Sequence, residues 1–264
     1  MDLRPGERSP DSTVEAGRRP LLVCFSQLRW DFVWQRPQHL MTRAARDYDV
    51  LFWEEPIHRP VSEAHLDLSG RPGGIRVAVP VLPDGTGPED AVAAGRRCLD
   101  TLLAAEARAP ALLWYYTPMA MAFTAHLAAD RVVYDNMDEL SAFLGAPAEL
   151  LRNEEALFGR ADLVFTGGQS LYEAKRHRHR SVTAFPSSID ASHFAAARAP
   201  DGPDPADQAA IPHPRLGYFA VMDERLDLGL VEAVAALRPD WQLVMLGPVV
   251  KIDPASLPRR PNVH

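Results

Sequence analysis

The segment FSQLRWDFVWQRPQHLMTRAA, residues 25–45, carries more functional groups than a chain reversal requires. A turn that only reverses the chain is built mainly from Gly, Asn or Ser. Arg36 offers a donor fork suited to a carboxylate or a phosphate, and Trp30 and Trp34 offer flat apolar surfaces of the kind that stack on sugar rings. The alternative is that both tryptophans only pack over the edge of a sheet. The candidate cleft residues of this segment are Trp30, Asp31, Arg36, Gln38 and His39.

If Arg36 contacts a ligand, its replacement by Ala should weaken binding and leave the melting temperature nearly unchanged. A large loss of stability would instead indicate a structural role for this side chain.

A second candidate site is the segment VVYDNMDELSAF, residues 132–143. Asp135 and Asp138 follow an apolar run there, and two carboxylates three residues apart could bind sugar hydroxyls or accept a proton. The alternative is that one of them caps the next helix.

A third candidate is FTGGQS, residues 165–170. Gly167 and Gly168 allow close backbone approach, and Ser170 could cap the following helix. Both a phosphate cradle and a simple tight turn fit this pattern, and the tight turn is favoured.

The run KRHRHR, residues 175–180, is the strongest cluster of positive charge. Its two histidines are two residues apart, so they face different sides of a helix and make a poor metal pair. A solvated helix end is the default interpretation, and contact with an anionic membrane surface is the alternative.

Two cations near the C-terminus follow apolar runs. Arg225 lies in VMDERLD and Lys251 lies in GPVVKID. A guanidinium or an ammonium group at such a position could reach a diphosphate. A salt bridge at the start of a helix is the alternative for Arg225.

These side chains must be positioned by the elements around them. Apolar runs alternate with helical patterns from residue 20 onward. The predicted strands are 21–25, 50–53, 74–81, 111–116, 131–134, 163–166, 182–185, 216–221 and 242–246. The first predicted helix begins at Pro37. Further helices are predicted over 89–108, 118–128, 149–158, 170–178 and 228–237.

Strands that are apolar along their whole length and alternate with helices indicate an α/β protein with a doubly wound parallel sheet of Rossmann-like type. Ligands bind such sheets at the carboxyl ends of the strands, where the candidate residues lie. We predict a disordered tail over 1–19, one domain over 20–195 and a Pro/Ala/Asp-rich linker over 196–214. Residues 215–264 then restart the pattern as the beginning of a second Rossmann-like domain.

Composition excludes several classes of function. The net charge of −7 argues against broad nucleic-acid binding. Two cysteines are too few for a disulfide framework or a cysteine-based zinc site, and they fit a cytoplasmic setting. No apolar run of membrane-spanning length and no secretory signal are found. Dinucleotide, P-loop and serine-hydrolase fingerprints are absent as well. We therefore expect no metal and no dinucleotide cofactor.

Taken together, several segments resemble a bacterial family of GT-B glycosyltransferases, similar to the retaining group 4. The resemblance is carried by FSQLRWDFVWQRPQHL, FWEEP, VVYDNMDELSAF, ADLVFTGGQSLYEAK, FPSSIDASHF, GYFAVMDERLD and PDWQLVMLGPVVKID. It implies an N-terminal acceptor domain facing a C-terminal domain that binds a nucleotide sugar. By this resemblance Arg225 and Lys251 would face the donor diphosphate, and Asp138 would lie beside the transferred sugar. No catalytic nucleophile is implied.

The implied activity is transfer of a sugar from a nucleotide-sugar donor to a glycan or lipid-linked acceptor, in polysaccharide biosynthesis. Residues 215–264 lack the acidic motif with which the family grips the donor, so we expect an incomplete donor domain. The chain would then be inactive alone or need a second chain. The alternative is a non-catalytic Rossmann-like binding module. A nucleotide-sugar epimerase is less favoured, because no dinucleotide fingerprint is present. The expected location is cytoplasmic, with peripheral contact at the inner membrane face as a further option.

Overall fold

The computed structural model describes residues 18–198, 202 and 204–264. The chain divides into two compact units, Met1–Ser188 and Ile189–His264. This boundary lies a few residues before the predicted domain end at 195. Most of the predicted tail and part of the predicted linker lie outside the described residues. Arg18 and Arg19, which were assigned to the tail, belong to the folded unit, because they pair with Glu106 and Asp49 at 3.0 and 3.2 Å.

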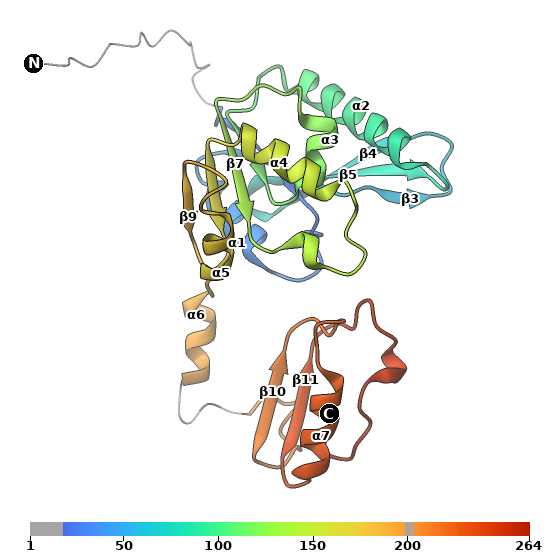
Figure 1. Ribbon diagram of the computed structural model, residues 1–264, viewed down its shortest axis with the longest axis vertical. Coiled ribbons are helices and arrows are strands. Elements are labelled where there is room, and N and C mark those ends of the chain that lie inside the picture. The colour runs from blue at the N-terminus through green and yellow to red at the C-terminus, as the bar shows by residue number, and fades with distance from the viewer. Residues whose placement is uncertain (1–17, 199–201, 203) are drawn as a thin grey trace, which may run out of the picture. The chain divides into compact units, whose positions relative to one another are not determined.

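The first unit is built on one mostly parallel sheet (Figure 1). Its strands are β1 (Leu21–Ser26), β2 (Asp49–Glu54), β3 (Ile57–Arg59), β4 (His65–Arg71), β5 (Ile75–Pro83), β6 (Leu112–Tyr115), β7 (Arg131–Asn136), β8 (Leu163–Thr166) and β9 (Val182–Ala184). They lie in the order β3-β5-β2-β1-β6-β7-β8-β9, and β4 pairs with β5. The predicted α/β class with a parallel, Rossmann-like sheet is confirmed.

The helices of this unit are α1 (Arg36–Ala44), α2 (Pro88–Glu106), α3 (Met121–Thr124), α4 (Leu150–Arg160) and α5 (Gln169–Lys175). Short 3-10 turns cover Pro72–Gly74, Pro118–Ala120 and Leu140–Ala142. Two separate clusters of buried apolar side chains show that both faces of the sheet are covered. Helices α2, α3 and α4 contribute to the cluster around Phe25 and Tyr115, and α1 contributes to the cluster around Cys24 and Phe52.

Successive residues of a strand point to opposite faces, so Phe25 and its neighbour Cys24 enter different clusters. All six residues of β1 are buried, and the first five of them are apolar; the sixth is Ser26.

Strands β3 and β4 were not predicted from the sequence. Most of their side chains are exposed, so they show little apolar periodicity. Strand β4 is held by its antiparallel pairing with β5, from His65↔Val81 to Arg71↔Ile75. The helix predicted over 118–128 is wrong in length, because it consists of a 3-10 turn and the short α3.

The second unit contains α6 (Ala191–Phe194), β10 (Arg215–Phe219), α7 (Leu228–Leu237) and β11 (Gln242–Leu246), with 3-10 turns at Ala195–Arg198 and Pro254–Ser256. Strands β10 and β11 are parallel, in register from Arg215↔Gln242 to Phe219↔Leu246. The residues after Arg260 return beside β11, where His264 N donates to Leu243 O at 2.9 Å. The Asn262 side chain donates to Ala235, Arg238 and Trp241 carbonyl oxygens at the end of α7.

Candidate functional site

The loop between β1 and α1 is fixed by two buried polar side chains. Glu54, the last residue of β2, accepts from Trp30 N at 2.7 Å and from Arg29 Nη1 at 3.0 Å. Gln38 is fully buried and its amide donates to the carbonyl oxygens of Arg29, Trp30 and Val33. Its Oε1 accepts from Gln35 N, which closes a capping box at the start of α1. Gln38 therefore holds the loop together from within.

Arg36 and Asp135 form the most buried ion pair between candidate site residues, with side chains 9% and 0% exposed. Arg36 Nη2 lies 2.9 Å from Asp135 Oδ1, and Arg36 Nε lies 3.0 Å from Asp135 Oδ2. A further donor of Arg36 bonds the Phe185 carbonyl oxygen. The guanidinium thus joins α1 to the ends of β7 and β9. Its donors are engaged within the unit, so it is held as a structural link.

The surroundings of Asp135 are both buried and polar. Burial raises the pKa of Asp135, and the Arg36 guanidinium opposes that rise. Burial, followed by the charge of Asp135, raises the pKa of the Tyr116 hydroxyl well above its usual range. The Tyr116 hydroxyl and Trp114 Nε1 are buried atoms without a hydrogen-bond partner of good geometry among the described residues. Helix α4 begins after Glu149, so Asp135 does not cap it.

The other candidates of the first loop have individual roles. Trp30 is 5% exposed and packs edge-on against Phe52, with ring centroids 5.0 Å apart. Trp30 therefore packs in the core, as the alternative interpretation of this residue proposed. Trp34 is 54% exposed, and its Nε1 donates to His39 Nδ1 at 3.1 Å. Asp31 is exposed and pairs with Arg71 at the end of β4.

The glycine pair after β8 is a tight turn. A Cβ on Gly167 would lie 2.4 Å from the Met137 carbonyl oxygen, whereas a Cβ on Gly168 would meet nothing within 4 Å. Gly167 N donates to Asn136 O at 2.9 Å, which joins this turn to the end of β7. Gly168 occupies the N-cap of α5, so the prediction that Ser170 caps this helix is wrong.

Glu139, Glu154, Lys175 and Arg178 form a partly buried ionic cluster between α4 and the end of α5. Glu154 accepts from Lys175 at 3.0 Å, from Arg178 at 2.6 Å and from the Tyr134 hydroxyl at 3.0 Å. Lys175 also reaches Glu139 at 2.9 Å. The predicted solvated helix end is therefore wrong for Lys175, which is 5% exposed. Asn136 Nδ2 donates to the Tyr134 hydroxyl and to the Asp138 carbonyl oxygen. These bonds place Asp138 at the end of β7.

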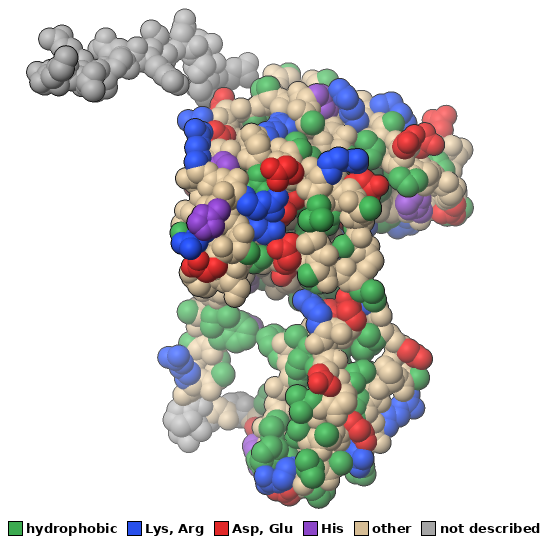
Figure 2. All heavy atoms as spheres, viewed as in Figure 1, with side chains coloured by type: hydrophobic (Ala, Val, Ile, Leu, Met, Phe, Trp, Pro, Cys, Tyr) green, Lys and Arg blue, Asp and Glu red, His purple; other side chains and the backbone are tan. Residues whose placement is uncertain are grey.

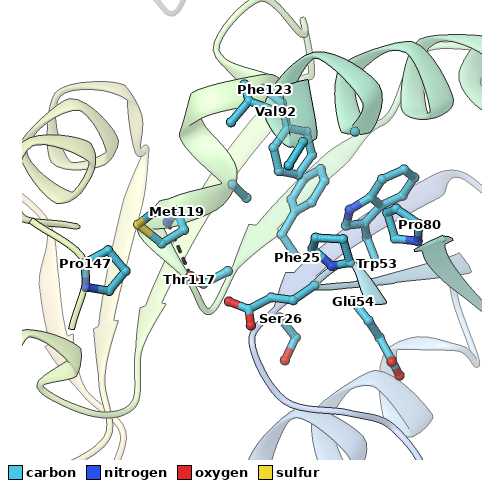
Figure 3. Close-up of a pocket in the computed structure, with 15 residues that line it drawn as sticks. Phe25, Ser26, Trp53, Glu54, Pro80, Val92, Thr117, Met119, Phe123 and Pro147 are labelled. Atoms are coloured by element: carbon cyan, nitrogen blue, oxygen red, sulfur yellow. Dashed lines mark hydrogen bonds between the residues drawn. The ribbon is translucent and has the colours of Figure 1, made fainter. Parts of the chain in front are cut away.

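The first unit contains a pocket of about 320 Å³ that no motif in the sequence predicted (Figure 3). Its walls come from the ends of β1, β2, β5 and β6 and from α2, α3 and the loop before α4. The lining residues are Phe25, Ser26, Trp53, Glu54, Glu55, Pro56, Pro80, Ala91, Val92, Gly95, Thr117, Met119, Ala120, Phe123 and Pro147. One signal was present in the sequence, because Glu54 and Glu55 directly follow a predicted strand.

In the second unit, Arg225 and Lys251 follow the two parallel strands. Arg225 Nη2 lies 2.6 Å from Asp223 Oδ2, and Lys251 Nζ lies 3.7 Å from Glu224 Oε1. The hydrogen bonds from Arg225 lower the pKa of Asp223, although burial opposes them. The two side chains are 59% and 47% exposed, so a ligand can reach both.

The two loops that carry these cations are closely joined. Met222 N donates to Pro248 O at 2.9 Å, and Val250 N donates to Met222 O at 3.0 Å. Gly247 has φ of +148°, and a Cβ there would lie 1.8 Å from the Ala220 carbonyl oxygen. Only glycine fits this close approach. Asp227 caps α7 by accepting from Leu230 N at 2.9 Å.

Within the part of the chain that the structure describes, no three or more His, Cys, Asp or Glu residues are grouped so that they could hold a metal ion. Nor does any described helix combine the length and the apolar character needed to cross a membrane. Positive and negative side chains are interspersed on the face shown in Figure 2.

No family model and no curated protein matches this sequence. Solved structures do share its fold. The α,α-trehalose-phosphate synthase (UDP-forming) from Burkholderia xenovorans, in complex with glucose-6-phosphate, has a TM-score of 0.57 at 14% identity, over 89% of this chain and 67% of that one. The catalytic domain of starch synthase IV from Arabidopsis thaliana, bound to ADP and acarbose, has a TM-score of 0.53 at 10% identity, over 90% and 70%.

A third structure is the E. coli trehalose-6-phosphate protein bound with UDP-2-fluoro glucose, with a TM-score of 0.53 at 14% identity over 86% of this chain. The match spans 64% of the length of the E. coli chain. These likenesses establish a Rossmann-like fold of the GT-B type for this chain.

Proposed function

We propose that this chain is the acceptor-side unit and part of the donor-side unit of a glycosyltransferase. The enzyme would move a sugar from a nucleotide-sugar donor to a hydroxyl of a glycan or lipid-linked acceptor. The observation that carries the proposal is the fold likeness, which extends over both units to structures that hold UDP-2-fluoro glucose or ADP with acarbose. The retaining group 4 is the family we favour, on the sequence resemblance.

The donor diphosphate would bind between the loops that follow β10 and β11. Sugar transfer requires stabilisation of the charge that builds on the leaving diphosphate. Arg225 and Lys251 are the cations at that strand edge, and each is paired with a carboxylate in this structure. A bound diphosphate would compete with Asp223 and Glu224 for these two side chains. We expect these two side chains to supply the positive charge for this step without a metal.

The first unit would hold the acceptor at the carboxyl ends of β1, β6 and β7. Asp138 and the exposed Trp34 lie in loops that follow β7 and β1. Both side chains suit a sugar, since carboxylates accept from hydroxyls and an indole presents an apolar face. Arg36 and Asp135 would support this edge through their ion pair without contacting the acceptor.

The test is titration of the full chain with UDP and with ADP in a calorimeter. We expect one of them to bind, and the double variant Arg225→Gln, Lys251→Gln to weaken that binding by about tenfold or more. Arg260→Gln is the control, because this exposed arginine of the same unit pairs with Glu232 on α7. Equal affinity of the double variant and the wild type would contradict the proposed diphosphate site.

A further inference from the structure

The pocket of the first unit is lined on one side by aromatic rings. Phe123 lies 6.0 Å from Phe25 and 5.9 Å from Trp53, measured between ring centroids. In Figure 3 these three side chains come together on one side, and Met119 and Pro147 approach from the other. Phe25 is fully buried and Trp53 is 3% exposed, so these rings are held in place by the core behind them. The wall is therefore rigid and apolar.

The size of the pocket limits the group that it can hold. Its volume is about 320 Å³. An apolar cavity of about 150 Å³ holds one benzene molecule, so this pocket has room for a group of roughly two rings. Gly95 adds to that room, because it lies in the interior of α2 and lines the pocket. A Cβ there would meet the Phe123 ring at 3.8 Å, an ordinary contact, so packing alone does not require glycine at this position.

The charge of the lining selects against anions. Among the described residues that line the pocket, the charged side chains are Glu54 and Glu55. Neither lysine nor arginine is part of that lining. An anion would lose its hydration and gain no cation in return, which is unfavourable. Glu54 is already paired with Arg29 at 3.0 Å, so it offers a ligand cation little. We therefore expect a neutral group to suit the mostly apolar lining.

The hydroxyl groups of Ser26 and Thr117 also line the pocket. Ser26 Oγ accepts from Leu28 N at 3.0 Å, and Thr117 Oγ1 accepts from Met119 N at 3.3 Å. Because a hydroxyl has one proton to donate and two lone pairs, each can still donate to an oxygen of a ligand. Both residues end or follow strands, β1 and β6, at the edge of the sheet where parallel α/β units bind ligands.

We propose that this pocket binds a neutral aryl or alkyl group of about two rings, and that Ser26 and Thr117 donate hydrogen bonds to its hydroxyl or ether oxygen. Under the proposed function, on which this assignment of the ligand rests, the group is the apolar part of the acceptor. The acceptor would then be a neutral glycoside or alcohol with an apolar group, and not a sugar phosphate.

The experiment uses 2-naphthol and 2-naphthyl phosphate, titrated into the full chain at neutral pH by calorimetry. The two probes share the two-ring group and differ in charge. We expect 2-naphthol to bind at least about tenfold more tightly than the phosphate. Ala91→Phe should weaken 2-naphthol binding by about tenfold or more, because Ala91 lines the pocket from α2. Ala93→Phe, at an exposed position of the same helix outside the lining, should leave it within about twofold.

Gly95→Ala provides a second variant that should stay folded, since Ala favours the helix interior over Gly. It should keep or raise the melting temperature and weaken 2-naphthol binding by at least about threefold. No binding of 2-naphthol, equal binding of the phosphate, or equal loss in the Ala91 and Ala93 variants would overturn the proposal. Titration with UDP or ADP in the same samples tests the glycosyltransferase proposal separately, so the failure of one is distinguishable from the failure of the other.

Discussion

Arg36 and Asp135 are 99 residues apart in the chain, yet Arg36 Nη2 lies 2.9 Å from Asp135 Oδ1 in the folded unit. The ion pair joins the first turn of α1 to the end of β7, and its carboxylate is fully buried. This relationship changes what is expected of Arg36. The sequence suggested that Arg36 binds a ligand and that its replacement would not affect stability. In the structure, its side chain is held in a buried ion pair.

We predict that Arg36→Ala destabilises the first unit by about 3–5 kcal/mol, because it leaves a buried carboxylate without its partner. The double variant Arg36→Met, Asp135→Leu should cost less than the sum of the two single variants. Arg71→Ala is the matched control, since its partner Asp31 is 65% exposed, and it should cost about 1 kcal/mol or less. Urea unfolding followed by tryptophan fluorescence measures all five variants: Arg36→Ala, Arg36→Met, Asp135→Leu, their double variant and Arg71→Ala. A double variant that loses the full sum would mean that the two side chains do not act as a pair.

Gly167 and Gly168 allow a comparison between neighbours. We predict that Gly167→Ala costs about 3 kcal/mol or more, because the new Cβ would overlap the Met137 backbone at 2.4 Å. Gly168→Ala should change stability by less than about 1 kcal/mol, since this residue has an extended backbone and open space around its Cα. The same unfolding experiment reports both values. A similar loss in the free energy of unfolding for the two variants would show that the turn can move away from β7.

In the second unit, Gly247→Ala should disorder the loops that carry Arg225 and Lys251. A Cβ at Gly247 overlaps the Ala220 carbonyl oxygen, and its φ of +148° is strained for any other residue. Hydrogen exchange of residues 220–225 should rise in this variant, and binding of UDP or ADP should fall with it. A Cβ on Gly217 in β10 would meet nothing within 4 Å, so Gly217→Ala should leave both the hydrogen exchange and the binding of UDP or ADP unchanged. Unchanged exchange in the Gly247 variant would mean that the loop adopts another path.

The stability of the first unit should fall in acid partly through Glu106. Burial alone would raise the pKa of this carboxyl, but the hydrogen bond from Arg76 and the charges of Arg18 and Arg108 lower it. A carboxyl with a lowered folded-state pKa contributes stability above its unfolded pKa, and this contribution is lost as the pH falls through the folded-state pKa. The loss should therefore occur below about pH 4.5.

Unfolding in urea at a series of pH values from about 7 to about 3 measures this effect. Glu106→Gln should be less stable than the wild type at neutral pH and should lose less stability than the wild type below about pH 4.5. Glu63→Gln, at an exposed glutamate, should follow the wild-type curve. Parallel curves for the Glu106 variant and the wild type would show that this cluster does not contribute to acid sensitivity.

Local patterns predicted most of the elements that the structure contains. The strand at 21–25 and the helix at 228–237 agree with β1 and α7 within a residue, because burial on a sheet or against it leaves a periodic signal in the sequence. Strand β4 left no such signal, since its place depends on hydrogen bonds to β5 and most of its side chains are exposed. The pocket was missed for a related reason. Its lining comes from six separate segments, and no short stretch of sequence carries its pattern.

The sequence by itself determined the order and type of most elements, and it placed the chemically active side chains after strands. Only the tertiary structure decided which of these side chains meet. The sheet places β1 between β2 and β6, which differs from the order in the chain, and β7 lies next to β6. That order places Asp135 within reach of Arg36, buries Trp30 against Phe52 and assembles the pocket around Phe25 and Trp53. Periodicity is a property of neighbouring residues, whereas these contacts depend on how whole strands are arranged.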